Sequence, residues 1–66
     1  MRSIGKKNIA LVKKMADDLY IGGEHSISII QDAILCFLPD KILNIWESAE
    51  DEIRRVVLDH IYPRTL

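Results

Sequence analysis

The stretch WESAEDEIRR, residues 46–55, holds the densest group of chemically active side chains in the sequence. Its four carboxylates are Glu47, Glu50, Asp51 and Glu52, and arginines follow at positions 54 and 55. On a helix, spacings of three and four residues place the first three of these acids on one face. Such a face can act as an acid–base pair, a metal site, a docking surface for a basic protein, or an ordinary solvated surface.

The arginines offer a simple electrostatic explanation for most of this acidic run. Ion pairs with helical geometry are expected for Glu50–Arg54, Asp51–Arg54, Asp51–Arg55 and Glu52–Arg55, each stabilising the helix by about 0.2–0.5 kcal/mol. Glu47 is the exception, because the residue four positions on is another acid. We therefore expect a solvated helix face with one unneutralised acidic edge, which a basic partner surface would select.

Catalytic and metal-binding interpretations find little support in the sequence. Acid–base chemistry needs carboxylates in a dry cleft that separates their pKa values, and a chain of 66 residues has little room for one. His25 and His60 are too far apart to form a motif such as HExxH, so we expect surface or capping positions for both. Cys36 has no neighbouring base, and we expect it to be buried. The chain is predicted to be no enzyme, with no cofactor and no metal.

Trp46 is the only tryptophan and is expected on the inner side of the third helix. Packing in the core is the simpler role. The alternative is a partly exposed anchor beside the acidic face, because tryptophan is enriched among the residues that dominate binding energy. We therefore group Trp46 with the predicted partner-binding surface.

Charge is divided unevenly along the chain although the net charge is only −1. Residues 1–14 contain basic side chains and no acid, whereas most of the acids lie between residues 15 and 52. Lys6, Lys7, Lys13 and Lys14 could contact phosphates, and this predicts direct nucleic-acid binding as an alternative function. The acidic middle of the chain would oppose it.

Three segments show helical periodicity, and they predict one domain of residues 1–66 with an all-α fold. The expected helices cover about residues 6–20, 26–37 and 39–61, separated by glycines 22–23 and by Pro39, with Pro63 ending the last. The second begins either at Ser26 or at the capping-box pair Ser28 and Gln31. The sequence therefore predicts a small three-helix bundle.

The segment 26–37 is apolar on nearly every side, so we expect it to be central in the bundle or half of a subunit interface. A symmetric dimer would cover Ile27, Ile30, Ile34 and Phe37. The longest apolar stretch, residues 27–38, is too short and too polar to span a bilayer. With a lone cysteine and no signal-peptide pattern, the sequence favours a cytoplasmic protein.

The string LPDKILNIWESAEDEIRR resembles the signature of the Hha/YmoA family, small all-α proteins that modulate the nucleoid protein H-NS. The family pattern falls on Leu38, Asp40, Leu43, Ile45, Trp46, Ser48, Ala49 and Asp51. The family continues with His-Arg where this chain has Glu52-Ile53, and the arginine-rich first helix and the C-terminal tryptophan segment of the family have no counterpart here. The resemblance implies that Asp51 is the acid that faces H-NS.

These observations together predict a small regulatory or accessory protein that acts by protein–protein interaction. The predicted partner surface is Glu47, Glu50 and Asp51 with Trp46, facing a basic surface of a nucleoid-associated or other regulatory protein. Size and the absence of a catalytic motif suggest a modulator from a bacterium, phage or plasmid.

Overall fold

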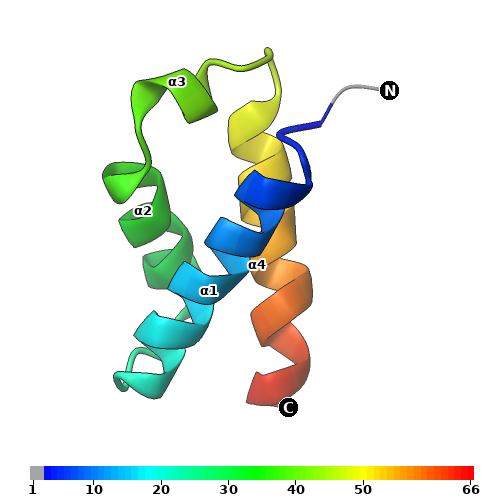
Figure 1. The fold of residues 1–66 in the computed structure, drawn as a ribbon. Helices are drawn as coiled ribbons and strands as arrows, with labels where there is room; N and C mark the ends of the chain where they lie inside the picture. The colour runs from blue at the N-terminus through cyan, green and yellow to red at the C-terminus, as the bar shows by residue number, and fades with distance from the viewer. Residues whose placement is uncertain (1–2) are drawn as a thin grey trace.

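Four helices make up the part of the chain that the computed structural model describes, residues 3–66. They are α1 (Lys6–Ile21), α2 (Ile27–Phe37), α3 (Asp40–Leu43) and α4 (Ala49–Thr65), and residues 3–66 contain no strand. Figure 1 shows α1 and α4 running in the same direction, α2 running against both, and the short α3 lying across one end. The predicted all-α fold is confirmed.

The first two helices end where local chemistry dictates. Gly23, with φ of 106°, takes a conformation that favours glycine, and the N–H of Glu24 then bonds to the carbonyl of Leu19 at 3.0 Å. The N-cap of α2 is Ser26, whose hydroxyl accepts a bond from the N–H of Ile29 at 3.4 Å. Of the two predicted starts, Ser26 is therefore the one that the chain uses.

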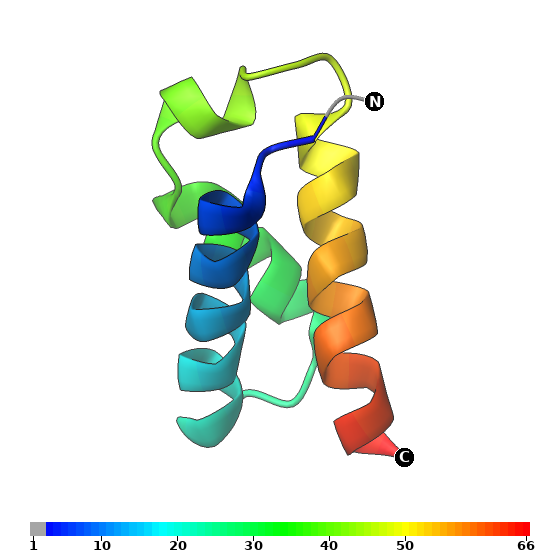
Figure 2. The same cartoon turned by 45° about the vertical axis from the view of Figure 1, so that its right-hand side comes forward.

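The prediction of one continuous third helix over residues 39–61 is wrong, because two helices, α3 and α4, occupy this part of the chain. Residues 44–48 form turns between α3 and α4, so Trp46 and Glu47 lie outside the helices. Ile42 and Ala49 are both buried, although the chain between them bends over the end of the bundle (Figure 2). The two residues are seven apart, a spacing that a continuous helix would also place on one face, so periodicity alone did not reveal the break.

The other end of α4 also differs from the prediction. The helix continues past Pro63 to Thr65 instead of ending before the proline. Proline lacks an N–H and its ring crowds the carbonyl four residues back, so it weakens this last turn. Contacts with α1, described below, compensate for that weakness.

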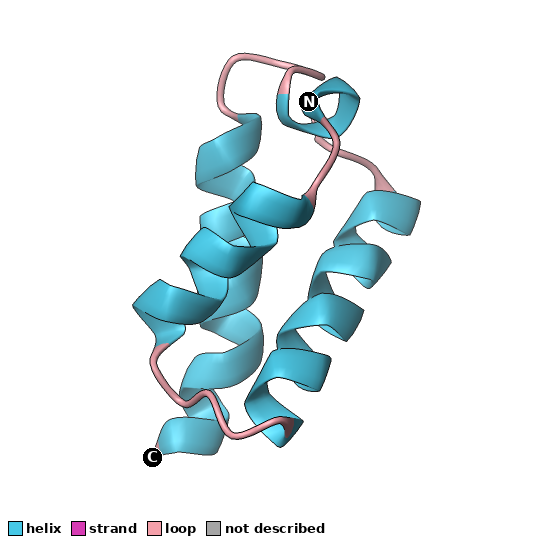
Figure 3. Ribbon diagram, turned by 90° about the vertical axis from the view of Figure 1, so that its left-hand side faces the viewer, coloured by secondary structure: helices cyan, strands magenta, loops and turns pink. Residues whose placement is uncertain are grey.

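Figure 3 shows the three long helices packed side by side, and the core residues, most of which come from these helices, are all aliphatic. The three long helices all pack against one another, and α4 also contacts α3, so α4, rather than the predicted second helix, is the central one. The fully buried side chains come from one stripe of each long helix. The core comprises Ile4, Val12, Ala16, Ile30, Ile34, Leu38, Ile42, Ala49, Ile53, Val57 and Ile61.

Two expectations about α2 need correction. Ile30 and Ile34 are completely buried inside the monomer, so they cannot form the surface of the predicted dimer. Ile27 is half-buried, and Phe37 is 75% exposed. Cys36, expected in the core, is exposed because it lies on the face of α2 opposite to Ile34. Within residues 3–66, no helix is long and apolar enough to cross a bilayer.

Candidate functional site

The predicted acidic surface lies at the N-terminal end of α4. Glu50 and Asp51 occupy the first turn of that helix, and Glu47 precedes it in the turn region. All three side chains are exposed, and none forms an ion pair within residues 3–66. The positive end of the helix dipole favours carboxylates in a first turn. The structure therefore places these acids at one end of the molecule, although Glu47 does not share a helical face with the others.

The arginines do not neutralise these acids as predicted. Arg54 pairs with Asp32 of α2 at 3.2 Å, and its carbonyl accepts a bond from the Gln31 amide at 2.9 Å. Arg55 is exposed and forms no ion pair within the described residues. The four predicted i,i+3 and i,i+4 pairs are absent within residues 3–66, and Arg54 instead bridges α4 to α2. The acidic end thus keeps more uncompensated charge than expected.

Glu52 differs from its acidic neighbours because it is an internal acceptor. Its Oε1 accepts bonds from the Ile4 N–H at 2.9 Å and from the Trp46 indole N–H at 3.1 Å, and its Oε2 accepts from the Ser3 hydroxyl at 2.7 Å. Trp46 is half-buried and packs against the core. Glu52 therefore positions Trp46 beside the exposed acids.

The lysines of α1 form a second charged surface. Lys6, Lys7, Lys13 and Lys14 are all exposed. Only Lys14 has an ion-pair partner among residues 3–66, the exposed Asp18 at 3.5 Å. Figures 1 and 2 show that α1 and α4 begin at the same end of the molecule. Lys6 and Lys7, in the first turn of α1, therefore lie at the same end as the acidic surface, whereas Lys13 and Lys14 lie about two turns further along α1.

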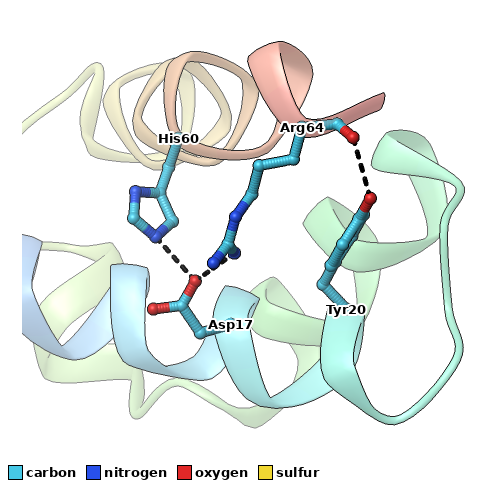
Figure 4. A network of polar contacts seen from close by, with 4 residues as sticks. All are labelled: Asp17, Tyr20, His60 and Arg64. Carbon is cyan, nitrogen blue, oxygen red and sulfur yellow. Dashed lines mark hydrogen bonds and ion pairs between the residues drawn. The ribbon is translucent and has the colours of Figure 1, made fainter. Parts of the chain in front are cut away.

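A polar network that sequence reasoning missed joins the C-terminal halves of α1 and α4 (Figure 4). His60 Nε2 lies 2.8 Å from Asp17 Oδ1, and the Arg64 guanidinium donates to the same oxygen. The Tyr20 hydroxyl donates to the Arg64 carbonyl at 3.0 Å. The bond from His60 is the main cause that holds the pKa of Asp17 below its usual value; desolvation opposes it, and the bond from Arg64 and the charges of His60 and Arg64 lower the pKa further.

The sequence carries a faint signal of this network. His60 and Arg64 are four residues apart, and Asp17 and Tyr20 are three apart, so each pair lies on one face of its helix. Nothing in the sequence shows that these two faces meet. His60 was expected at the surface or at a cap; it is half-buried and bonded to Asp17. His25 remains at the surface, with its ring edge-on to Tyr20 at 4.7 Å.

Two of the hollows on the described surface are shallow and lie along α4. The larger, about 320 Å³, is lined by Leu58, Asp59, Tyr62 and Pro63 and is mostly apolar. The smaller, about 230 Å³, lies between α1 and α4. Its lining is Ile9, Lys13, Val56, Asp59 and His60.

The chemistry open to these hollows is limited by the bonding of their polar groups. The smaller hollow contains three titratable side chains, but no hydrogen bond links them to one another, and Nε2 of His60 is bonded to Asp17. General acid–base catalysis needs such groups within hydrogen-bonding reach of a shared substrate atom. Within residues 3–66, no three His, Cys, Asp or Glu side chains lie close enough to hold a metal ion.

No protein family, curated protein or solved structure matches the chain.

Proposed function

We propose that the chain is a small regulatory or accessory protein that acts by binding another protein through the acidic end of α4. The observation that carries this proposal is that Glu47, Glu50 and Asp51 are exposed and form no ion pair within residues 3–66. Exposed carboxylates of this kind steer a basic partner and set its orientation more than they add affinity. Trp46, held beside them by Glu52, supplies the apolar contact that charge alone lacks.

The partner we propose is a basic surface of a nucleoid-associated or other regulatory protein inside a bacterial cell. The resemblance of residues 38–51 to the Hha/YmoA signature supports H-NS as the first candidate. In that family the acid corresponding to Asp51 faces H-NS, and here Asp51 is exposed in the first turn of α4.

A binding titration with purified H-NS tests the proposal, with capture from a bacterial lysate to identify other partners. Glu47→Lys combined with Asp51→Lys should weaken binding by about tenfold or more, since two surface charges are reversed. The matched control is Asp18→Lys with Asp59→Lys, which makes the same charge change at exposed acids elsewhere. Equal recovery of the same proteins by the wild type and the acidic-end variant would refute the docking surface.

Direct nucleic-acid binding through α1 is the second candidate, supported by its exposed and mostly unpaired lysines. A gel shift at about 50 mM and about 200 mM salt separates it from docking, because phosphate contacts weaken steeply with salt. Replacing Lys6, Lys7 and Lys13 with alanine should reduce the shift. No retardation at the lower salt would exclude this function.

A further inference from the structure

The last turn of α4 contains a proline, which weakens its backbone hydrogen bonding. Pro63 has no N–H, so the carbonyl of Asp59 loses its helical donor, and the proline ring crowds that carbonyl. This turn is also the C-terminal end of α4, and the ends of helices fray most readily. Even so, the helix continues to Thr65.

Tertiary contacts from α1 account for this continuation. Arg64 donates to the Asp17 carboxylate, its guanidinium carbon lies 5.3 Å from the centre of the Tyr20 ring, and its carbonyl accepts the Tyr20 hydroxyl (Figure 4). One residue of the weak turn therefore has three separate contacts with α1. His60, one turn earlier, bonds to the same carboxylate oxygen.

We propose that residues 62–65 form a latch, docked on α1 through the ionised Asp17 and released when that carboxylate is neutralised. Neutralisation removes the charge that draws both Arg64 and His60, so two charge-assisted bonds weaken together. The contacts that remain do not depend on the charge of Asp17: those of Arg64 with Tyr20, and the bond that the Thr65 hydroxyl donates to the Tyr62 carbonyl at 2.8 Å. The turn would then return to the frayed state that its proline favours.

The latch also controls a surface of the molecule. Tyr62 and Pro63 are two of the four residues that line the apolar hollow of about 320 Å³. When the turn is undocked, that hollow loses half of its lining. The latch lies at the opposite end of α4 from the acidic surface and shares no residue with it, so the two proposals can be tested separately (Figure 1).

Other charged groups near Asp17 set the background for any pH dependence. On α4 these are Asp59, His60 and Arg64. On α1 they are Lys13, one turn before Asp17, and the exposed pair Lys14 and Asp18. The connection between α1 and α2 adds His25, which contacts Tyr20, and Glu24, whose carboxylate accepts the N–H of Ser26.

Backbone NMR of the isotopically labelled chain tests the latch directly. Asp17→Asn should speed amide exchange at Arg64 and Thr65 by about fivefold, a figure discounted for partial exposure of the network. Asp18→Asn, the adjacent acid on α1, should leave these amides unchanged. Tyr20→Phe should loosen the turn by itself but keep its dependence on pH.

A pH titration of the wild type provides a second measurement that does not depend on any variant folding. The helical Cα shifts of residues 62–65 should collapse over the same pH range in which the Asp17 carboxyl carbon titrates. In Asp17→Asn that step should be missing. Unchanged exchange in Asp17→Asn, or a pH step that survives in it, would overturn the latch.

Discussion

At the scale of single residues, Glu52 and Asp17 show how one carboxylate can join distant parts of a small chain. Glu52 connects α4 to the N-terminal segment at Ser3 and Ile4 and to Trp46 in the turns. Asp17 connects α1 to two residues of α4. Both acids point between elements and are used internally, whereas Glu47, Glu50 and Asp51 lie in solvent.

Glu52→Ala should lower the free energy of unfolding by about 2 kcal/mol. The change leaves the Ile4 N–H and the Trp46 indole N–H without their acceptor in a partly buried place, and the loss of bonds to a charged acceptor has this size. Urea unfolding followed by Trp46 fluorescence measures it. Glu50→Ala, an exposed acid of the same helix, should stay within about 0.5 kcal/mol of the wild type. Equal stability of the two variants would show that Glu52 is not a structural acceptor.

Asp17 should make the chain less stable in acid, with a sign that follows from its lowered pKa. The folded state releases the Asp17 proton more readily than the unfolded state does. The contribution to stability is therefore complete above about pH 5, where the unfolded carboxyl is fully ionised, and is lost as the pH falls through the unfolded and then the folded pKa.

Urea unfolding of the wild type and of Asp17→Asn, from about pH 6 down to about pH 2, measures this linkage. The difference in unfolding free energy between them should be constant at the upper end and shrink toward the lower end. Asp18→Asn gives the reference for a nearby acid. A difference between wild type and Asp17→Asn that does not vary with pH would contradict the linkage.

At the scale of elements, hydrophobic periodicity together with capping and helix-breaking residues predicted most helix boundaries. It did not predict which helix faces contact each other. The first two helices were predicted within one residue at each end, because Gly22, Gly23, Ser26 and Pro39 act locally. The break at residues 44–48 was missed because the buried residues on either side of it, Ile42 and Ala49, are spaced as they would be on one face of a continuous helix. Ser48, three residues before Asp51, has the spacing of a helix start and was the available signal.

For the candidate site residues, exposure was predicted correctly, whereas the ion pairs between helices were not. Exposure of Glu47, Glu50, Asp51 and the lysines agrees with their charge, a property that each side chain carries by itself. The pairing of Arg54 with Asp32 and of Asp17 with His60 depends on contacts between helices. Single-sequence reasoning favoured local pairs, because spacing along one helix is the only distance that it contains.

Pro63→Ala should stabilise the last turn of α4 and make it less dependent on α1. Restoring the N–H and removing the ring clash should raise the free energy of unfolding by about 1 kcal/mol, less than the ~3 kcal/mol of a helix interior because terminal turns fray. Asp17→Asn should then cost less in this background than in the wild type. Thermal and urea unfolding of the four variants of this double-mutant cycle measure both effects. Additive effects would mean that the proline and the latch are not coupled.

At the scale of the whole molecule, the buried apolar residues of each long helix pack inside a single copy of the chain. The apolar residues left outside are scattered over all parts of the described chain. The most exposed large ones are Leu11, Ile21, Ile29, Phe37, Ile45, Tyr62 and Leu66. A chain of this size buries only about 60% of its unfolded surface, so its stability margin is small.

Ile34→Ala tests whether α2 serves the monomer core, as its burial indicates, or an interface between copies. Removing a completely buried isoleucine should lower the free energy of unfolding by about 3–4 kcal/mol, enough to unfold much of so small a domain. Ile29→Ala, on the exposed side of the same helix, should change it by less than about 0.5 kcal/mol.

Circular dichroism with urea unfolding at two protein concentrations about tenfold apart measures both, since a dimer gains stability with concentration by mass action. A wild-type midpoint independent of concentration, together with a large loss in Ile34→Ala alone, is the expected result. A midpoint that rises with concentration and falls in Ile29→Ala would place α2 in a subunit interface instead.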